Sequence, residues 1–524
     1  MGLASGSIAP RRTAAVCAGL LAIAFAALLW IASSAKAAEV IYWENYKDNT
    51  IAYANIDGSG GGLLNLTGIT LNDPEGMAYD PVTNRLFVAS SNGGPAGEGQ
   101  IVFVNLDGSG AGVLSTPGVT IDSPDAVALD PATRTLYWTN FTSTESIGWA
   151  KLDGSAAGTL NTTGTTVERT YKLALDPASG RVFWSNEPPS GPETINFANA
   201  NNTGGGGTLN LSGASAPEGI TGMAVNTVSG RLYWLDQDRE GVSSVALSGG
   251  SGADLNISGA PFKSPYGLAI DPSLGRVYWA NYGLSAERLG AIGFAGLSGG
   301  GGGINVATTP VNGTQDPVIL KSPSGTGAPA VTRSTKSRSS LSCSTGTWAV
   351  DYPGSYVYQS PRSLAYQWTR NGTPISGATA TTYLATSAGS YACTVTAANQ
   401  AGSAAQASAG VKVKSAKVKL TTKKKVSVKP GGVAKFKLKG VNQGDIQSKK
   451  ARVCVKLPKS AKGVLTAPKC ATLGKLKGRG KHGATVKIKV GKSAVGTYKV
   501  SFSVHGSPGT AAKAKILVVA PKKK

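Results

Sequence analysis

Histidine is nearly absent from this 524-residue sequence. Its two histidines, His482 and His505, both lie in the last fifth of the chain. The first four hundred residues therefore cannot supply an imidazole as a general base, a general acid or a metal ligand. This excludes a Ser-His-Asp triad, a Cys-His pair and a His-ligated zinc there. We expect no catalytic residues, no metal site and no cofactor.

Acidic residues are almost absent from the C-terminal part. Residues 411–524 contain 31 Lys and Arg and one acid, Asp445, whereas residues 38–323 contain 13 basic and 26 acidic residues. The tail has only two arginines and few aromatic residues, so it lacks the stacking surface of single-strand nucleic-acid binders. We expect it to bind anionic cell-envelope polymers and do not expect nucleic acid as a partner. The alternatives are a solvated face or docking on the chain's own acidic part.

A long uncharged stretch rich in Ala and Leu lies near the N-terminus. Arg11 and Arg12 precede an uncharged stretch at 13–35, and Ala35-Lys36-Ala37 has the form that signal peptidases cut. We expect a signal peptide at 1–37 and an exported protein. An uncleaved anchor is the alternative, because the stretch is long enough to span a bilayer.

Cysteine is scarce, and four cysteines remain beyond the signal peptide: Cys343, Cys393, Cys454 and Cys470. An even number in an exported chain indicates disulfides. The simplest pairing is Cys343 with Cys393 and Cys454 with Cys470, one bridge in each of two domains. The other two connectivities would link the domains to each other.

Two sequence elements recur six times in the same phase. An aromatic-rich segment such as TLYWTN occurs at residues 42, 87, 137, 183, 233 and 278, and an L-N-x-[TS]-G element, with departures, occurs at 65, 115, 161, 210, 256 and 305. Each unit contains short Val-, Ile-, Tyr- and Trp-rich runs bounded by Asp-Pro and Asp-Gly, which predict four strands and no helix. The Ala-rich first strand suits the centre of a propeller, and the aromatic second strand suits the space between neighbouring sheets.

These units resemble the low-density-lipoprotein-receptor class B (YWTD) repeat, whose family fold is a six-bladed β-propeller. The resemblance covers about residues 38–323, although Asn usually replaces the final Asp of the motif. The first unit lacks its inner strand, and QDPVILKSP at 315–323 resembles the inner-strand segment at 72–81. We therefore predict that 315–323 completes the first blade and closes the ring.

One position in each repeat lies just ahead of the inner strand and is variable. The aligned residues are Glu75, Asp125, Tyr171, Thr221 and Tyr266, and the sixth position is ambiguous near Pro317 and Val318. We predict that they line a ligand-binding rim at one axial opening. The alternative is that they are loop positions that vary without a ligand.

Residues 324–412 begin with a Pro-, Gly- and Ser-rich linker and continue with Cys343, Trp368, Tyr391 and Cys393. This order resembles an immunoglobulin-type sandwich of bacterial surface proteins. The spacing from Cys to Trp is longer than usual, and the excess falls at 351–363. In residues 413–524 Lys alternates with apolar residues, which predicts a second immunoglobulin-like β-sandwich with lysines outside.

The fold class predicted is therefore all-β, a six-bladed β-propeller plus two immunoglobulin-like β-sandwiches. The favoured function is an exported cell-surface recognition or adhesion protein whose propeller binds a protein or other ligand, as the resemblance implies. One alternative is a lactonase- or lyase-like propeller enzyme that uses a carboxylate-bound metal. Another is a structural wall component without a specific ligand.

Overall fold

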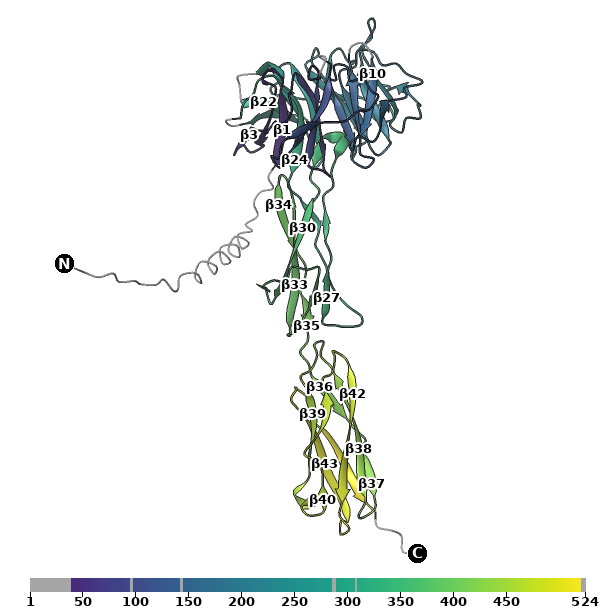
Figure 1. Cartoon of the computed structure of the whole chain (residues 1–524), viewed down its shortest axis with the longest axis vertical. Coiled ribbons are helices and arrows are strands. Elements are labelled where there is room, and N and C mark those ends of the chain that lie inside the picture. Colours follow the sequence, from purple (N-terminus) through teal and green to yellow (C-terminus); the bar gives the residue numbers. More distant parts are fainter. Residues whose placement is uncertain (1–38, 95–97, 142–144, 285–288, 307–308, 520–524) are drawn as a thin grey trace, which may run out of the picture. The chain divides into compact units, whose positions relative to one another are not determined.

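A computed structural model describes residues 39–94, 98–141, 145–284, 289–306 and 309–519 (Figure 1). These residues contain strands and short 3₁₀ helices but no α-helix, so the all-β prediction is confirmed. No helix within the described ranges has the length and apolar character needed to cross a bilayer. The predicted signal peptide lies outside the described residues.

The chain divides into two compact units. The first contains the residues up to Ser324 together with Trp348–Ser363 and Ala397–Ala404, and the second contains Gly325–Thr347, Leu364–Thr396 and the residues from Ala405 onward. The predicted domain boundaries therefore differ from this division at two short segments of the middle domain. Both segments, 348–363 and 397–404, belong to the unit that holds the repeats.

The repeats of the first unit form six sheets, each with four antiparallel strands. From the inside outward, the first sheet contains β24 (Thr314–Lys321), β1 (Glu39–Asn45), β2 (Thr50–Asn55) and β3 (Gly61–Leu63), and the second contains β4 (Pro74–Asp80), β5 (Arg85–Ser90), β6 (Gln100–Asn105) and β7 (Ala111–Val113). The third contains β8 (Val127–Asp130), β9 (Thr135–Asn140), β10 (Ser146–Lys151) and β11 (Ala157–Thr159), and the fourth contains β12 (Leu173–Asp176), β13 (Arg181–Asn186), β14 (Thr194–Asn199) and β15 (Gly207–Thr208). The fifth contains β16 (Ile220–Asn226), β17 (Arg231–Asp236), β18 (Gly241–Ala246) and β19 (Ala253–Asp254), and the sixth contains β20 (Pro265–Asp271), β21 (Arg276–Asn281), β22 (Leu289–Gly296) and β23 (Gly301–Asn305). The 3₁₀ helices η1 (Tyr46–Asp48) and η2 (Tyr282–Leu284) follow two of the second strands.

The inner strands form a closed ring. β24, β4, β8, β12, β16 and β20 contact one another in this order, and β20 contacts β24. β24 pairs antiparallel with β1, from Lys321 opposite Glu39 to Thr314 opposite Asn45. The prediction that the C-terminal segment supplies the inner strand of the first sheet is therefore confirmed. A ring of radial four-stranded sheets is the arrangement of a β-propeller.

Side-chain size follows position in the ring. The second strands carry tryptophans that are fully buried, at Trp43, Trp138, Trp184, Trp234 and Trp279. The inner strands carry small buried residues, Ala78, Ala128, Ala174, Ala224 and Ala269. Small residues let the inner strands converge, and the large rings fill the space that widens away from the axis.

A segment from outside the repeats docks on the ring. It contains η3 (Pro353–Ser355) and β29 (Val357–Tyr358), and β29 pairs in parallel with β24. Ser355 Oγ donates a hydrogen bond of 2.5 Å to the carbonyl of Val225 near the end of β16. Val357 and Tyr358 are buried in the propeller core. The long insertion expected at 351–363 is therefore an axial plug, a name used below for Tyr352–Tyr358.

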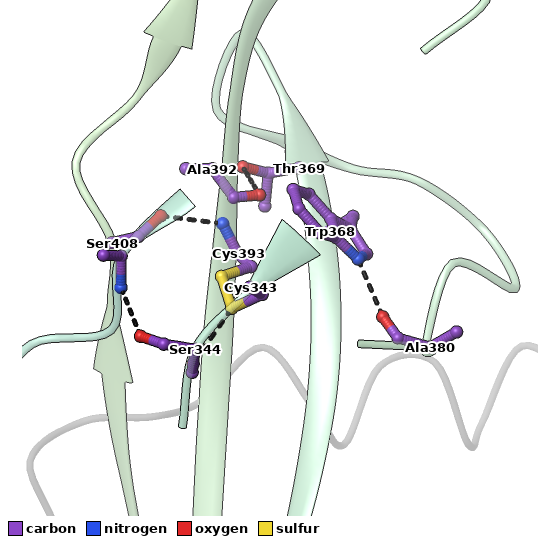
Figure 2. The surroundings of a disulfide bond; sticks show 9 residues. Cys343, Ser344, Trp368, Thr369, Ala380, Ala392, Cys393 and Ser408 are labelled. Atoms are coloured by element: carbon purple, nitrogen blue, oxygen red, sulfur yellow. Dashed lines mark hydrogen bonds between the residues drawn. A yellow bond between two sulfur atoms is a disulfide. The ribbon is translucent and has the colours of Figure 1, made fainter. Parts of the chain in front are cut away.

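The first sandwich of the second unit is built around a disulfide between two sheets (Figure 2). One sheet contains β26 (Val331–Arg333), β27 (Ser340–Cys343) and β32 (Thr382–Leu384), and the other contains β31 (Thr373–Pro374), β30 (Ser363–Arg370), β33 (Gly389–Asn399) and β34 (Gly402–Ala407), with β35 (Val411–Val413) on β33. Cys343 bonds to Cys393, as predicted. Trp368 is fully buried beside the bridge and donates its indole N–H to Ala380 O. A separate pair is β25 (Gly325–Gly327) with β28 (Thr347–Trp348).

The Lys-rich sandwich has two sheets on one apolar core. They are β36 (Val418–Thr421), β38 (Val433–Asn442), β42 (Lys481–Val490) and β40 (Leu465–Thr466); and β37 (Lys425–Val428), β44 (Ala512–Val518), β43 (Gly496–His505), β39 (Ala451–Lys456) and β41 (Cys470–Gly474), with η4 (Lys459–Ala461) between β39 and β40. Phe436 and Phe502 face each other in the core at 5.2 Å between ring centroids. Cys454 bonds to Cys470 on the adjacent strand, which is the second predicted bridge.

Substitution of Gly354 tests the plug. A Cβ at Gly354 would lie 2.4 Å from the carbonyl oxygen of Leu175, so we expect Gly354→Ala to displace the plug and to cost about 1–3 kcal/mol of propeller stability. Limited proteolysis at Arg362 and the melting temperature measure the effect. Gly483→Ala is the control, because the nearest atom there, Leu438 O, is 3.6 Å away. Equal melting and equal cleavage of the two variants would show that the plug is not inserted.

Candidate functional site

The predicted rim residues lie at the start of the inner strands, but they differ in exposure. Glu75, Tyr171, Thr221 and Tyr266 are half-buried, whereas Asp125 is buried. Register shifts interrupt the pairing of β4, β16 and β20 at this end, between Glu75 and Met77 in the case of β4. Such β-bulges re-aim side chains. All five residues stand at or just before the start of an inner strand, and this end of the ring is called the mouth below.

An ion-pair cluster fills the axis beneath the mouth. Lys172 Nζ lies 3.0 Å from Asp125 Oδ1 and 2.9 Å from Asp316 Oδ2, and the Lys172 side chain is only 2% exposed. Burial opposes the charged form of Lys172, but the carboxylates of Asp125 and Asp316 outweigh it and raise its pKa well above the ordinary value. Asp316 Oδ2 also accepts the backbone N–H of Gly76 at 3.1 Å. The cluster therefore joins four of the six sheets.

Carboxyl groups outnumber ammonium groups in this cluster. Burial and the negative charge of Asp125 raise the pKa of Glu75 to about 10. Burial and the charge of Asp316 raise the pKa of Glu44 well above its ordinary range. Glu44 is fully buried, and neither of its carboxyl oxygens has a hydrogen-bond partner among the described residues. One ammonium therefore serves four carboxyl groups, and Glu75 is protonated at neutral pH.

Sequence reasoning missed Lys172 and Asp316. The aligned residues at the position of Lys172 are Gly76, Ala126, Gly222, Gly267 and Asp316. Most residues at this position are small because the inner strands converge there: a Cβ at Gly76 would lie 2.6 Å from the Cα of Ala126. A Lys among these small residues was a signal in the sequence that Lys172 has a special role. The strand pairing places Gln315 at the sixth rim position and Asp316 at the position equivalent to Lys172, so the assignment of the sixth rim position near Pro317 and Val318 was wrong by two or three residues.

The opposite end of the axis is closed by the plug. Tyr356 is buried, and its hydroxyl donates to the carbonyl of Leu173 at 3.2 Å. Between Tyr356 and Lys172 remains an axial cavity of about 10 Å³ that is lined by both residues, by Asp316 and by apolar side chains such as Met77. This volume suits at most about one water molecule. A ligand can therefore reach the cluster only from the mouth.

Aromatic residues surround the mouth, and three of them were not predicted. Tyr46, Phe141 and Tyr282 directly follow the second strands β1, β9 and β21, and all three are half-buried. Phe141 packs on Tyr171 at 4.5 Å between ring centroids, and Tyr282 lies 6.0 Å from Tyr266. The signal was an aromatic residue directly after the YW-type motif in three of the six repeats.

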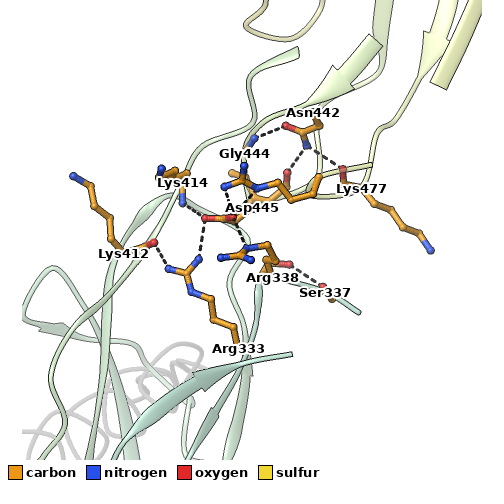
Figure 3. A network of polar contacts seen from close by, with 12 residues as sticks. Arg333, Ser337, Arg338, Lys412, Lys414, Asn442, Gly444, Asp445 and Lys477 are labelled. Carbon is orange, nitrogen blue, oxygen red and sulfur yellow. Dashed lines mark hydrogen bonds and ion pairs between the residues drawn. The ribbon is translucent and has the colours of Figure 1, made fainter. Parts of the chain in front are cut away.

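In the second unit, the one acid of the basic tail is a structural anchor (Figure 3). The Asp445 side chain is fully buried and lies 3.2 Å from Arg333 and 3.3 Å from both Arg338 and Arg479. Burial alone would raise the pKa of Asp445, but the hydrogen bond from the Lys414 backbone N–H and the arginine charges lower it below its ordinary value. Asp445 therefore joins the two sandwiches and is not available to neutralise the lysines.

Those lysines form rows on the outer faces of the Lys-rich sandwich. Lys435 on β38 lies directly opposite Lys487 on β42. Lys515 on β44 lies between Lys425 on β37 and Lys499 on β43. All five are exposed, and adjacent strands are only about 4.8 Å apart. Directly opposed like charges destabilise a sheet, so these rows repel one another within the folded domain.

Among the described residues, no group of three or more His, Cys, Asp or Glu side chains is arranged to hold a metal ion. No protein-family profile and no curated protein matches the sequence. Among solved structures, a nidogen/laminin complex is 16% identical, covers 54% of this chain and 98% of its own, and has a TM-score of 0.42. A gluconolactonase from Xanthomonas campestris is 12% identical, covers 57% of this chain and 87% of its own, and has a TM-score of 0.37. TolB from Acinetobacter baumannii is 13% identical, covers 54% of this chain and 66% of its own, and has a TM-score of 0.40. They are similar in fold alone.

Removal of the axial ammonium tests the cluster. Lys172→Met leaves Asp125 and Asp316 buried without a cation, so we expect the free energy of unfolding of the propeller to fall by about 3–5 kcal/mol at pH 7. The loss should shrink at acidic pH, because the two carboxyls can then be protonated. Tryptophan fluorescence in denaturant measures both values. Lys151→Met, at a half-buried lysine outside the axis, is the control, and equal stabilities of the two variants would contradict the prediction.

Proposed function

We propose that this chain is an exported surface-recognition protein in which a six-bladed YWTD-type propeller, carried by two immunoglobulin-like sandwiches, binds a protein. The observation that carries the proposal is the group of half-buried aromatic rings around the mouth: Tyr46, Phe141, Tyr171, Tyr266 and Tyr282. Rings with an apolar body and a polar tip supply much of the binding energy in protein interfaces. They lie at the ends of strands or in the segments directly joined to them, where a rigid scaffold can vary residues for recognition.

A protein ligand fits this face better than a small molecule. Small-molecule sites are usually enclosed cavities of about 300–1,000 Å³, whereas the axial cavity below Lys172 has a volume of about 10 Å³. Because the plug closes the other end, the available contact surface is the mouth and its surrounding loops. A broad surface with a charged centre is typical of a protein interface.

We propose a non-catalytic role. In the rival hypothesis, a lactonase- or lyase-like enzyme, axial carboxylates hold a metal ion. Here the ammonium of Lys172 lies within 3.0 Å of two of the converging carboxylates. A tethered cation at that place satisfies the charge that a metal would otherwise satisfy. This favours recognition over metal-assisted catalysis.

We further propose that the Lys-rich sandwich holds the protein at an anionic cell envelope. The support is the pair of lysine rows, in which Lys435 opposes Lys487 and Lys515 opposes Lys499. The two disulfides agree with an oxidising compartment outside the cytoplasm. A purely structural wall component would use the same anchoring domain but would not need an aromatic mouth.

Removal of two rings tests recognition by the mouth. We expect Tyr46→Ala/Tyr282→Ala to weaken capture of a cell-surface protein by the immobilised chain at least about tenfold, because each ring contributes interface area. Quantitative pull-down across protein concentrations measures the change. Val82→Ala/Val228→Ala, at exposed turns at the opposite ends of their inner strands, is the matched control. Equal capture by both double variants would remove the mouth from the interface.

Charge reversal within a lysine row separates anchoring from stability. Lys487→Glu places a carboxylate opposite Lys435, so we expect a gain of about 0.5 kcal/mol in unfolding free energy at low salt that fades at high salt. Retention of the same variant on purified cell wall should fall. The control is Lys475→Glu, which makes the same charge change at an exposed lysine outside these rows. We expect this control to be retained on the cell wall better than Lys487→Glu and to gain no stability. Retention insensitive to salt would contradict electrostatic anchoring.

A further inference from the structure

The mouth contains an acid, Glu75, that has no ion-pair partner among the described residues. Lys172 pairs with Asp125 and Asp316 but not with Glu75. Glu75 lies beside the Asp125 carboxyl, at the half-exposed outer end of the cluster. The two buried aspartates therefore hold the internal cation directly. A second positive charge at the mouth would favour the ionised form of Glu75.

A second observation is that polar groups near and below the mouth lack hydrogen-bond partners among the described residues. Glu44 lies on β1, where the equivalent second-strand residues include Ala89 and Ala280. It is fully buried, its two carboxyl oxygens have no hydrogen-bond partner within the described ranges, and it feels the charges of Asp316 and Lys172. The Thr221 hydroxyl at the rim is likewise buried without a partner among those residues. The site thus has more acceptors than its own donors can satisfy.

The walls of the mouth are suited to a cation. Tyr266 already places its ring 5.2 Å from the Lys172 ammonium, in a cation–π arrangement. Tyr282 presents a ring to Lys47 at 4.7 Å. Aromatic rings attract ammonium and guanidinium groups, more strongly where water is excluded. Half-buried tyrosines beside an unbalanced carboxyl therefore form a receptor for a positively charged group.

We propose that the mouth binds a primary ammonium or guanidinium group, of the kind that a Lys or Arg side chain of a partner protein carries, with Glu75 as the direct acceptor. This inference rests on the proposed recognition function and specifies its ligand chemistry. The bound group donates to Glu75 and stacks against Tyr266. Since Glu75 is protonated in the free protein, binding transfers its proton to solvent and leaves an ammonium–carboxylate pair.

Proton release depends on every group that faces Glu75. The neighbouring charged and titratable groups are Asp125, Lys172 and Asp316 in the cluster, and Tyr46 and Tyr266 at the rim. The pKa of Tyr46 is raised to about 12, by burial first and by the charges of Asp73 and Glu75 next. Burial and the charge of Asp125 also raise the pKa of Tyr266. Both phenols stay protonated near neutral pH, so a proton released on binding comes from Glu75.

The test is calorimetric titration of the full chain at pH 7 with Nα-acetyl-lysine methylamide, in two buffers of different ionisation enthalpy. The neutral norleucine analogue is the matched probe. We expect millimolar binding of the lysine probe, at least tenfold tighter than that of the neutral probe, with release of about one proton. Glu75→Gln should weaken binding at least tenfold and abolish proton release, while Glu240→Gln, at an exposed acid outside the mouth, should change neither.

Glu75→Gln keeps the fold intact, because the amide has the shape of the protonated carboxyl. In the natural chain, folding raises the pKa of the Glu75 carboxyl. Glu75 therefore stabilises the folded state below pH 4.5, and this contribution to stability is lost as the pH rises toward 10. The variant should therefore melt higher than the natural chain at pH 8 and equally at pH 4. Equal binding of the two probes, or binding without proton release, overturns the proposal.

The outcome also separates this inference from the proposed function. If the lysine probe fails to bind but the Tyr46→Ala/Tyr282→Ala variant still loses its partner, the ligand chemistry is wrong and recognition by the mouth stands. If the probe binds with proton release but the tyrosine variant keeps its partner, the cation site stands and the proposed interface is wrong.

Discussion

The buried ion pair of Lys172 with Asp125 and Asp316 is the interaction on which the ring and its mouth depend. Asp316 belongs to β24, the last strand of the repeats, and it is 144 residues from Lys172 in sequence. The pair can form only when β24 has joined β1 and closed the circle. Closure therefore buries a charge and its counter-charges in one step, and an open ring would leave Lys172 among apolar inner strands without Asp316. Since isolated buried charges are strongly unfavourable, the pair favours the closed ring over open alternatives.

Closure also makes the two ends of the axis different. At one end, the plug places Ser355 and Tyr356 against backbone carbonyls of the inner strands and seals the interior. At the other, Glu75 and the tyrosines remain half-exposed above the ion pair. Sealing one end lowers the dielectric constant around the cluster, which strengthens its electrostatic effects. The raised pKa of Glu75 follows from burial and from Asp125, and the plug, a segment outside the repeats, helps to keep the cluster dry.

Much of the fold could be predicted because repetition reveals it. Six aligned motifs predicted the strands, the small inner residues and the role of 315–323, and cysteine parity predicted both disulfides. The plug could not be predicted in this way, because 351–363 occurs once and its partners are backbone carbonyls far away in sequence. Lys172 stands out among the small residues aligned with it, but the sequence does not show that it faces two carboxylates far away in the chain. Periodic patterns specify a scaffold, whereas charge pairing across a ring is a property of its three-dimensional closure.

In the basic tail, arginines and lysines occupy different positions: arginines pair with the buried acid, and lysines cover the outer strands. Asp445 pairs only with arginines, Arg333, Arg338 and Arg479, whose planar guanidinium groups match a carboxylate in a fixed geometry. The lysines of the outer strands have no acid to pair with, because Asp445 is the single acid of 411–524 and is buried. A strand face that places Lys435 opposite Lys487 accepts repulsion within the folded sheet. That repulsion is relieved by counter-ions or by a polyanion, and release of small ions on binding a polyanion favours the polymer. The arginine contacts thus order the junction, and the proposed anchoring role falls to the lysines, which are not used in it.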